Sequence, residues 1–311
     1  MSTPNRISLL LIVMRNSLIP LVLLLVVLNA GASEPIKLWP QGVPGETSDM
    51  GVEHDTTGQN GGLVDGKRVI RLGNVSVPTI TFYPSSSVKD NGATMIVCPG
   101  GGYHILAMDL EGTEVCQWLN SIGMNAVLLK YRVPASKGLE RYAAPLQDAQ
   151  RALSLVRSHA AEWKIDPNRI GIMGFSAGGH LSAAASTGFT KRTYKPIDPA
   201  DKVSCRPDFT MLIYPAYLIH QKGPELSPEL TVNSDTPPTF IFQTEDDPIP
   251  VEGSLYYYLA LKQAKVPAEM HLFASGGHGY GLRGSNRTPK SWPKLAEKWM
   301  RGLDILKIEK P

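Results

Sequence analysis

The residues best suited to chemistry form the pentapeptide Gly174-Phe175-Ser176-Ala177-Gly178, which matches the pattern G-x-S-x-G. It directly follows the apolar run Ile170–Met173 and directly precedes a helical stretch. A turn from strand to helix that is sharp enough to expose a serine hydroxyl strains the backbone, and flanking glycines remove the clashes of a Cβ atom. The pentapeptide alone also occurs in ordinary loops, but this context predicts that Ser176 is a nucleophile.

A second element is Pro99-Gly100-Gly101-Gly102-Tyr103, which follows an apolar run ending at Cys98. Glycines in such a turn leave backbone N–H groups open to a substrate, and the residue after the nucleophile adds another donor. Donors aimed at a developing oxyanion contribute about 3–4 kcal/mol each. We predict an oxyanion hole made by Gly101, Gly102 and Ala177. A phosphate loop is disfavoured, because no Walker lysine follows the glycines and their spacing does not fit G-x-G-x-x-G.

A serine nucleophile needs a general base, and His278 lies where the chain order serine, acid, histidine would place it. It stands in Gly276-Gly277-His278-Gly279-Tyr280, after the last predicted strand. Two other histidines lie closer in sequence to the motifs above. We interpret His104 as a residue that lines the pocket, and His180 as a helix residue that faces the packing or the substrate.

A carboxylate must hold the histidine in the correct tautomer and stabilise its imidazolium. Glu245, Asp246 and Asp247 follow the strand predicted at Thr239–Gln243. Their position alone leaves all three carboxylates open for this role.

Strand and helix patterns alternate along most of the chain, which predicts the α/β class with a doubly wound, mostly parallel sheet and helices on both faces. The predicted strands are Thr79–Tyr83, Thr94–Cys98, Ala126–Lys130, Ile170–Gly174, Thr210–Tyr214, Thr239–Gln243 and Glu269–Phe273. The predicted helices are Gly112–Ile122, Leu146–Trp163, Gly179–Ser186, Glu252–Ala264 and Pro293–Ile308.

Three segments lie outside this alternation. The stretch from Ile36 to about Gly73 is rich in Gly, Pro, Asp and Thr and predicts an extended lead-in with little regular structure. The segments Gly188–Pro207 and Ala216–Pro238 predict surface excursions. Because ligands of open α/β sheets bind beyond the carboxyl ends of the strands, each is either part of a pocket rim or a plain connection.

The length and composition of the 311 residues suit one large α/β domain as well as two small ones, and we assign residues 33–311 to one catalytic domain because the strand and helix alternation runs through them. The net charge is only +3 and no long block of like charge occurs, so nucleic acid is not an expected partner. Histidines, acids and cysteines lack metal-ligand spacing. We therefore expect a small or polysaccharide ligand and neither a cofactor nor a metal.

The N-terminus predicts a signal peptide over residues 1–32. The apolar run Leu18–Leu28 follows Arg15 and precedes Ala30-Gly31-Ala32, a pattern typical of signal cleavage. We expect a secreted or periplasmic protein with no stable membrane association after cleavage; translation beginning at Met14 and an uncleaved anchor are the alternatives. The run is shorter than the ~20 residues of a membrane span. Cys98, Cys116 and Cys205 allow at most one disulfide. Cys98 lies in an apolar strand pattern and Cys116 in a helical one, so we interpret these two as small buried hydrophobic residues.

Taken together, the motifs resemble bacterial α/β-hydrolase esterases described as acetylxylan esterase, feruloyl-esterase-like or xylanase-associated lipase or esterase. The likeness covers nearly all of residues 33–311. It is carried by Leu38-Trp39-Pro40, Pro44-Gly45, Cys98-Pro99-Gly100-Gly101-Gly102-Tyr103, Tyr131-Arg132-Val133-Pro134, Asp148-Ala149-Gln150-Arg151-Ala152, Ile165-Asp166-Pro167-Asn168-Arg169-Ile170-Gly171, Gly174-Phe175-Ser176-Ala177-Gly178-Gly179-His180 and Gly276-Gly277-His278-Gly279-Tyr280-Gly281.

The resemblance implies a serine carboxylesterase that hydrolyses short acyl esters, acetyl or feruloyl, on carbohydrate. Related hydrolases usually carry the acid, two spacers, an aliphatic residue and proline, which selects Asp246, with Asp247 as the alternative. Pro99 stands where a histidine often precedes the glycines, which leaves the geometry of that loop open. The rival functions are a serine peptidase of the prolyl-oligopeptidase type and a non-catalytic binding protein on the same fold.

Overall fold

A computed structural model of the chain describes residues 31–45, 50–59, 61–86, 90–135, 138–220, 225–284 and 289–306. The predicted signal peptide lies outside these residues, except for Gly31 and Ala32. No helix in the described part of the chain combines the length and the apolar character of a membrane span.

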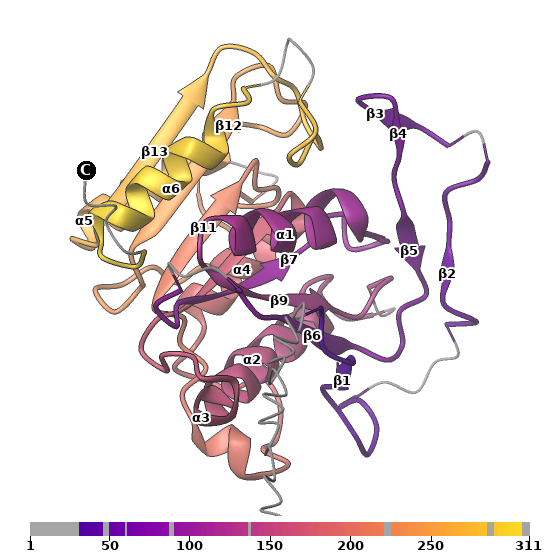
Figure 1. Cartoon of the computed structure of the whole chain (residues 1–311). Coiled ribbons are helices and arrows are strands. Elements are labelled where there is room, and N and C mark those ends of the chain that lie inside the picture. Colours follow the sequence, from indigo (N-terminus) through magenta and orange to yellow (C-terminus); the bar gives the residue numbers. More distant parts are fainter. Residues whose placement is uncertain are drawn as a thin grey trace, which may run out of the picture.

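An eight-stranded sheet forms the centre of the fold, in the order β1-β6-β9-β7-β10-β11-β12-β13 (Figure 1). The strands from β9 to β13 are parallel, and β6 and β1 are added antiparallel at one edge. Each predicted strand is confirmed to within a residue at either end. The bounds are β1 Ile36–Lys37, β6 Thr79–Tyr83, β7 Thr94–Cys98, β9 Asn125–Lys130, β10 Ile170–Phe175, β11 Phe209–Ile213, β12 Thr239–Thr244 and β13 Ala268–Phe273.

Helices cover both faces of this sheet, as the doubly wound prediction requires. On β7, Ile96 packs in the cluster that holds α2, α4 and α5, whereas its neighbour Val97 packs in the cluster that holds α1 and α6. Successive side chains of a strand point to opposite faces, so the two clusters are the two sides of one sheet. The bounds are α1 Glu114–Ser121, α2 Ala143–Ser158, α3 Ala160–Trp163, α4 Ala177–Thr187, α5 Glu252–Gln263 and α6 Trp292–Gly302, with a π-helical turn η1 at Asp109–Thr113 and a 3₁₀ turn η2 at Pro199–Lys202.

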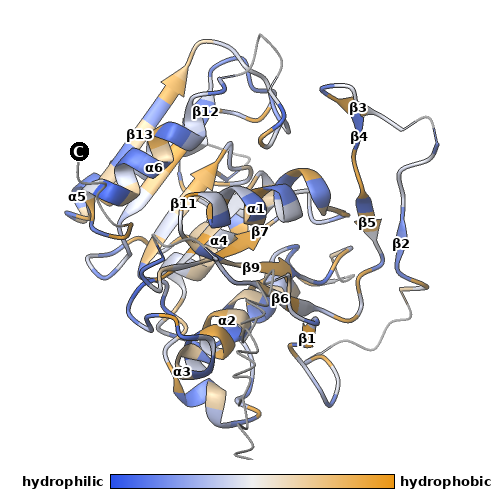
Figure 2. Ribbon diagram, in the orientation of Figure 1, coloured by the Kyte–Doolittle hydropathy of each residue, from blue (hydrophilic) through white to orange (hydrophobic). Residues whose placement is uncertain are grey.

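The hydropathy of each element depends on whether it lies in the central sheet or in a layer of covering helices. Figure 2 shows hydrophobic colour along β7, β9 and β11, whereas α6 carries both colours. All residues of β7 and β11 are buried. Parallel strands covered by helices on both faces must be apolar along their whole length, while a covering helix needs only one apolar side.

The lead-in is more regular than predicted, because short strands pair across it. β5 (Arg71–Gly73) pairs with β2 (His54–Asp55) and with β8 (Leu106–Ala107), and β3 (Leu63–Val64) forms a hairpin with β4 (Lys67–Arg68). Strands of two or three residues carry too little periodicity to be predicted. Pairing with β8 holds the lead-in against the segment that follows the glycine-rich loop (Figure 1).

The two predicted excursions have different roles. In the first, Asp198 and Asp201 form ion pairs with the buried Arg151 of α2, so this segment is a structural connection. The second, Ala216–Pro238, supplies Tyr217 and Glu229 to a pocket described below. Cys98, Cys116 and Cys205 are all free and buried.

Candidate active site

Ser176 stands on a sharp turn between β10 and α4. Its backbone has φ 52° and ψ −119°, a conformation that a residue with a Cβ rarely adopts. The Ser176 N–H donates to the carbonyl of Ile213 at 3.1 Å, and its own carbonyl accepts from Ala216 N at 3.0 Å and His180 N at 3.1 Å. These bonds to β11 and α4 hold the strained turn.

The spacing of the pentapeptide follows from the close packing of this turn. A Cβ atom on Gly174 would lie 1.9 Å from the carbonyl oxygen of Gly178, and one on Gly178 would lie 2.1 Å from the carbonyl oxygen of Cys98. Both distances are far below van der Waals contact. Glycine is therefore required at both flanking positions.

His278 reaches the serine from the loop after β13. Its Nε2 lies 2.8 Å from Ser176 Oγ, and its Nδ1 lies 2.9 Å from Asp247 Oδ2. The Asp247 side chain is fully buried, whereas that of His278 remains 21% exposed. Serine, imidazole and carboxylate thus form one hydrogen-bonded chain.

The carboxylate in this chain is Asp247, so the prediction of Asp246 is wrong. Asp246 is exposed, and its Oδ1 accepts from the backbone N–H groups of Gly276 and Gly277, both at 2.8 Å. The N–H donated by Gly277 lowers the pKa of Asp246. Asp246 therefore binds the backbone of the histidine loop instead of the imidazole.

A tight turn explains the shift by one position. Asp247 N donates to the carbonyl of Thr244 at 3.3 Å, which closes a tight turn. Glu245 and Asp246 are the exposed residues at the corners of this turn, whereas Asp247 is buried. Asp247 Oδ1 then accepts from Ile249 N at 2.8 Å, which fixes the side chain.

The glycine-rich loop after β7 lies beside the serine. Gly101 and Gly102 have φ of 138° and 65°, and a Cβ on Gly101 would lie 2.0 Å from the carbonyl oxygen of Ile105. Within the described residues, the N–H groups of Gly101, Gly102 and Ala177 have no protein acceptor. Backbone N–H groups that lack a partner beside a nucleophile are suited to bind an oxyanion.

The sequence reasoning missed Glu111, which lies beneath this loop and is only 3% exposed. Its Oε2 accepts from Gly100 N at 2.8 Å, and its Oε1 accepts from the hydroxyl of Tyr214 at 2.7 Å. That hydroxyl in turn accepts from Gly281 N at 2.8 Å. Burial raises the pKa of Glu111. One carboxyl therefore joins the glycine-rich loop to the histidine loop.

A second chain of hydrogen bonds begins at Tyr103 in the glycine-rich loop. The Tyr103 hydroxyl lies 2.7 Å from His180 Nδ1, and His180 Nε2 lies 2.8 Å from Glu229 Oε1. His180 thus packs within the protein, in line with its interpretation as a helix residue. His104 is exposed and does not line the pocket at the serine, so that interpretation was wrong.

A cavity of about 260 Å³, here called the serine pocket, opens at these groups. Its lining consists of Val69, Arg71, Gly101, Gly102, Ile105, Ala107, Leu110, Glu111, Ser176, His278 and Gly279. The described residues contain no group of His, Cys, Asp and Glu arranged to hold a metal ion. The arrangement of this pocket is suited to nucleophilic attack by serine on a carbonyl carbon.

Comparison with known proteins agrees with this chemistry. The family described as BD-FAE matches residues 81–204. The acetylxylan esterase of Xylanibacter ruminicola is 32% identical over 228 residues, 65% of this chain and 43% of that protein. Endo-1,4-beta-xylanase B of Butyrivibrio fibrisolvens is 33% identical over 204 residues, 60% of this chain and 32% of that protein. The chain thus spans less than half the length of these two curated relatives.

Among solved structures, the acetyl ester-xyloside bifunctional hydrolase of Caldicellulosiruptor lactoaceticus is 42% identical, with a TM-score of 0.66. The match covers 75% of this chain and 90% of that one. The resemblance inferred from the motifs is confirmed, and the chain belongs to the α/β-hydrolase family of esterases.

Proposed function

We propose that the protein is a serine carboxylesterase that removes short acyl groups, acetyl above all, from carbohydrate. The observation that carries the proposal is the position of His278, within hydrogen-bond distance of both Ser176 and Asp247. The chemistry of such a triad needs neither a cofactor nor a metal.

In the first half of the reaction, His278 Nε2 takes the proton of Ser176 Oγ as the oxygen attacks the ester carbonyl carbon. Asp247 accepts the Nδ1–H of His278 and stabilises the imidazolium that forms. The carbonyl oxygen becomes negatively charged and accepts hydrogen bonds from the backbone N–H groups of Gly101, Gly102 and Ala177. The bond to the alcohol oxygen then breaks, His278 returns the proton to that oxygen, and the acyl group remains on Ser176.

In the second half, a water molecule replaces the alcohol. His278 removes its proton while the water oxygen attacks the acyl carbon, and the same N–H groups bind the oxyanion. Cleavage of the bond to Ser176 Oγ releases a free acid and restores the serine with the proton from His278. Atoms and charge balance as ester plus water giving acid plus alcohol.

Two observations support a short acyl group on a sugar. The side chains of Val69, Ile105, Ala107 and Leu110 give the serine pocket an apolar wall, and its 260 Å³ is small for an acyl-binding site that must also admit the ester. Two of the similar proteins are named for acetyl esters: one is an acetylxylan esterase and the other is an acetyl ester-xyloside bifunctional hydrolase. A feruloyl group is the alternative acyl group.

The test is the Ser176→Ala variant with p-nitrophenyl acetate. We expect loss of turnover by a factor of about 10⁶, because removing a triad nucleophile leaves only binding and oxyanion stabilisation. Circular dichroism on the same samples reports whether the variant is folded. A folded variant that still turns over the ester would refute the proposal.

A fluorophosphonate probe separates this function from its rivals. Labelling of wild type, and no labelling of Ser176→Ala, excludes a non-catalytic binding protein. Comparison of p-nitrophenyl acetate with a peptidyl p-nitroanilide then separates an esterase from a peptidase, because only the esterase leaves the anilide intact.

We also propose that residues 1–32 direct export. Expression in a bacterial host followed by N-terminal sequencing of the exported protein tests this: a mature chain beginning at Ser33 is expected. A chain that retains residues 1–32 and sediments with the membranes would mean that the segment is an anchor.

A further inference from the structure

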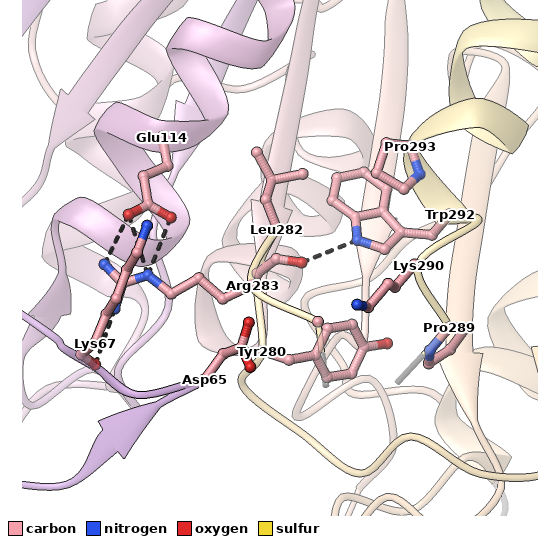
Figure 3. A pocket seen from close by; sticks show the side chains of 12 residues that line it. Asp65, Lys67, Glu114, Tyr280, Leu282, Arg283, Pro289, Lys290, Trp292 and Pro293 are labelled. Atoms are coloured by element: carbon pink, nitrogen blue, oxygen red, sulfur yellow. Dashed lines mark hydrogen bonds and ion pairs between the residues drawn. The ribbon is translucent and has the colours of Figure 1, made fainter. Parts of the chain in front are cut away.

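Two cavities flank the serine pocket and differ in what lines them. The first, here called the tyrosine pocket, has a volume of about 350 Å³ and includes Arg141, Tyr142, His180, Tyr217, His220 and Glu229. The second, the hairpin pocket, also has about 350 Å³ and lies between the β3–β4 hairpin and the chain that follows His278 (Figure 3). Both volumes fall within the range of about 300–1,000 Å³ found for small-molecule sites.

The tyrosine pocket adjoins the glycine-rich loop. The hydroxyl of Tyr217 lies 3.7 Å from where a Cβ on Gly102 would stand, and the Tyr217 ring stacks on that of Tyr103 with centroids 6.0 Å apart. A substrate whose carbonyl oxygen meets Gly102 therefore has this pocket as its neighbour.

The lining combines aromatic faces with groups that pair with hydroxyls. Tyr142 and Tyr217 both line the cavity and are only partly buried, but the Tyr217 ring already contacts Tyr103 and Arg141, which leaves Tyr142 as the ring available to a sugar. The exposed Arg141 lies 4.6 Å above the Tyr217 ring and offers several N–H donors, while Glu229 offers an acceptor. The C–H faces of a sugar ring pack on aromatic rings, and sugar hydroxyls both donate to carboxylates and accept from guanidinium groups.

The fixed charges of the pocket disfavour an anionic ligand. Glu140 and Glu229 line the pocket together with one guanidinium, that of Arg141, so the fixed charge does not attract an anion. The floor is rigid, because both ring nitrogens of the buried His180 are already hydrogen-bonded within the protein. A preformed pocket with aromatic and polar walls, in which carboxylates outnumber guanidinium groups, fits a polyhydroxylated ring better than an anion.

The hairpin pocket lacks these features. Its aromatic residues Tyr280 and Trp292 are only 4% and 1% exposed, so they offer no face to a sugar. Figure 3 shows Arg283 held by Glu114 and the Trp292 indole donating to the chain; the indole bond reaches the Gly281 carbonyl at 3.0 Å. The Arg283 guanidinium and the Trp292 indole are therefore already hydrogen-bonded within the protein.

We propose that the tyrosine pocket binds a neutral glycosyl unit of the substrate, next to the sugar that carries the ester. The proposal rests on the esterase function proposed above, and it names the part of the substrate that gives selectivity. Arg141 and Glu229 hold the hydroxyls, and Tyr142 packs against the ring.

The experiment compares three esters: acetylated xylobiose, p-nitrophenyl acetate, which has no sugar, and methyl ferulate, which has an aromatic acyl group and no sugar. The variants are Arg141→Ala and Tyr142→Ala. Matched controls are Arg206→Ala, whose guanidinium lies 5.6 Å above the Phe189 ring at another part of the surface, and Lys290→Ala in the hairpin pocket.

We expect kcat/KM for acetylated xylobiose to fall at least tenfold more than kcat/KM for p-nitrophenyl acetate in both variants, and the ratio to stay constant in both controls. An unchanged ratio in Arg141→Ala and Tyr142→Ala overturns the proposal. A parallel selective loss with methyl ferulate also overturns it, since the pocket would then hold the acyl group.

A binding measurement separates failure of the pocket from failure of the enzyme. Calorimetry of xylotriose, which carries no ester, with the Ser176→Ala protein needs no turnover. Binding that weakens at least tenfold when Arg141→Ala is added supports the pocket, and binding of equal strength in both proteins, or none in either, overturns it. Absent turnover of p-nitrophenyl acetate by wild type would instead overturn the proposed function.

Discussion

The two sides of Ser176 use their polar groups in different ways. Toward the histidine loop, residues 276–281, polar groups pair inside the protein: Asp247 with His278 and Ile249, and Glu111 with Gly100 and Tyr214. In the tyrosine pocket, Arg141 and Glu140 are exposed and Tyr142 is only partly buried. Under the two functions proposed above, the internally paired groups fix the geometry of the reaction and the open ones select the substrate.

This comparison makes a general prediction. Changes on the histidine side should reduce the turnover of all esters by the same factor, because every substrate passes through the same transition state. Changes in the tyrosine pocket should alter the ratio between sugar esters and simple esters.

Asp247→Ala should reduce kcat by about 10⁴-fold, because the imidazole loses the partner that orients it and stabilises its charge. The loss should be equal for p-nitrophenyl acetate and acetylated xylobiose. Steady-state kinetics of both esters measure it, and Glu245→Ala, an exposed acid of the same turn, is the control. Retention of more than a tenth of wild-type activity would remove Asp247 from the triad.

Glu111→Gln should reduce kcat by about 10–100-fold with little change in KM, since misaligned oxyanion donors weaken binding of the transition state. Both carboxyl oxygens of Glu111 accept hydrogen bonds, and an amide would turn an N–H toward one of the two donors. Separate determination of kcat and KM for p-nitrophenyl acetate measures this effect. The control is Glu269→Gln, whose carboxylate binds His271 on β13. A raised KM at constant kcat would mean that Glu111 contacts the substrate and does not position the loop.

Glu229→Gln tests the junction of the two sides, because Glu229 lines the tyrosine pocket and also supports Tyr103 through His180. A neutral hydrogen bond is about 1 kcal/mol weaker than one to a charged group, which corresponds to about a fivefold effect. We expect a loss of that size with p-nitrophenyl acetate and a larger one with acetylated xylobiose. Kinetics of both esters measure the difference, and equal losses would assign Glu229 to the support of the loop alone.

The sequence was sufficient for the residues that local patterns specify. Ser176 and His278 stand in glycine-flanked turns after apolar runs, and close packing of the backbone at Gly174 and Gly178 explains why such a pattern is informative. The central strands were predictable because buried parallel strands read as continuous apolar runs.

The acid was missed by one position, because the hydrogen bond from Asp247 to Thr244 decides which side chain of the turn faces the sheet. Glu111 and Tyr214 could not be predicted: they are 103 residues apart, and neither belongs to a motif. The pairing of a buried carboxyl with a distant hydroxyl is a property of tertiary packing, which periodicity does not report. Glu229 was missed in the same way.

Asp246→Asn should have the smallest effect and thereby separates the two neighbouring acids. An amide oxygen can still accept from Gly276 N and Gly277 N, so kcat for p-nitrophenyl acetate should stay within about threefold of wild type. Stability should respond to pH. Hydrogen bonding by Gly277 N lowers the pKa of Asp246 in the folded protein, so the carboxylate stabilises the fold above its ordinary pKa of 3.8, and this contribution is lost as pH falls through the folded value. Thermal unfolding of both proteins from neutral pH to below pH 3.8 should show wild type more stable at neutral pH and the difference closing in acid. A loss of activity as large as that of Asp247→Ala would instead show that the backbone of the histidine loop is as critical as the imidazole's own partner.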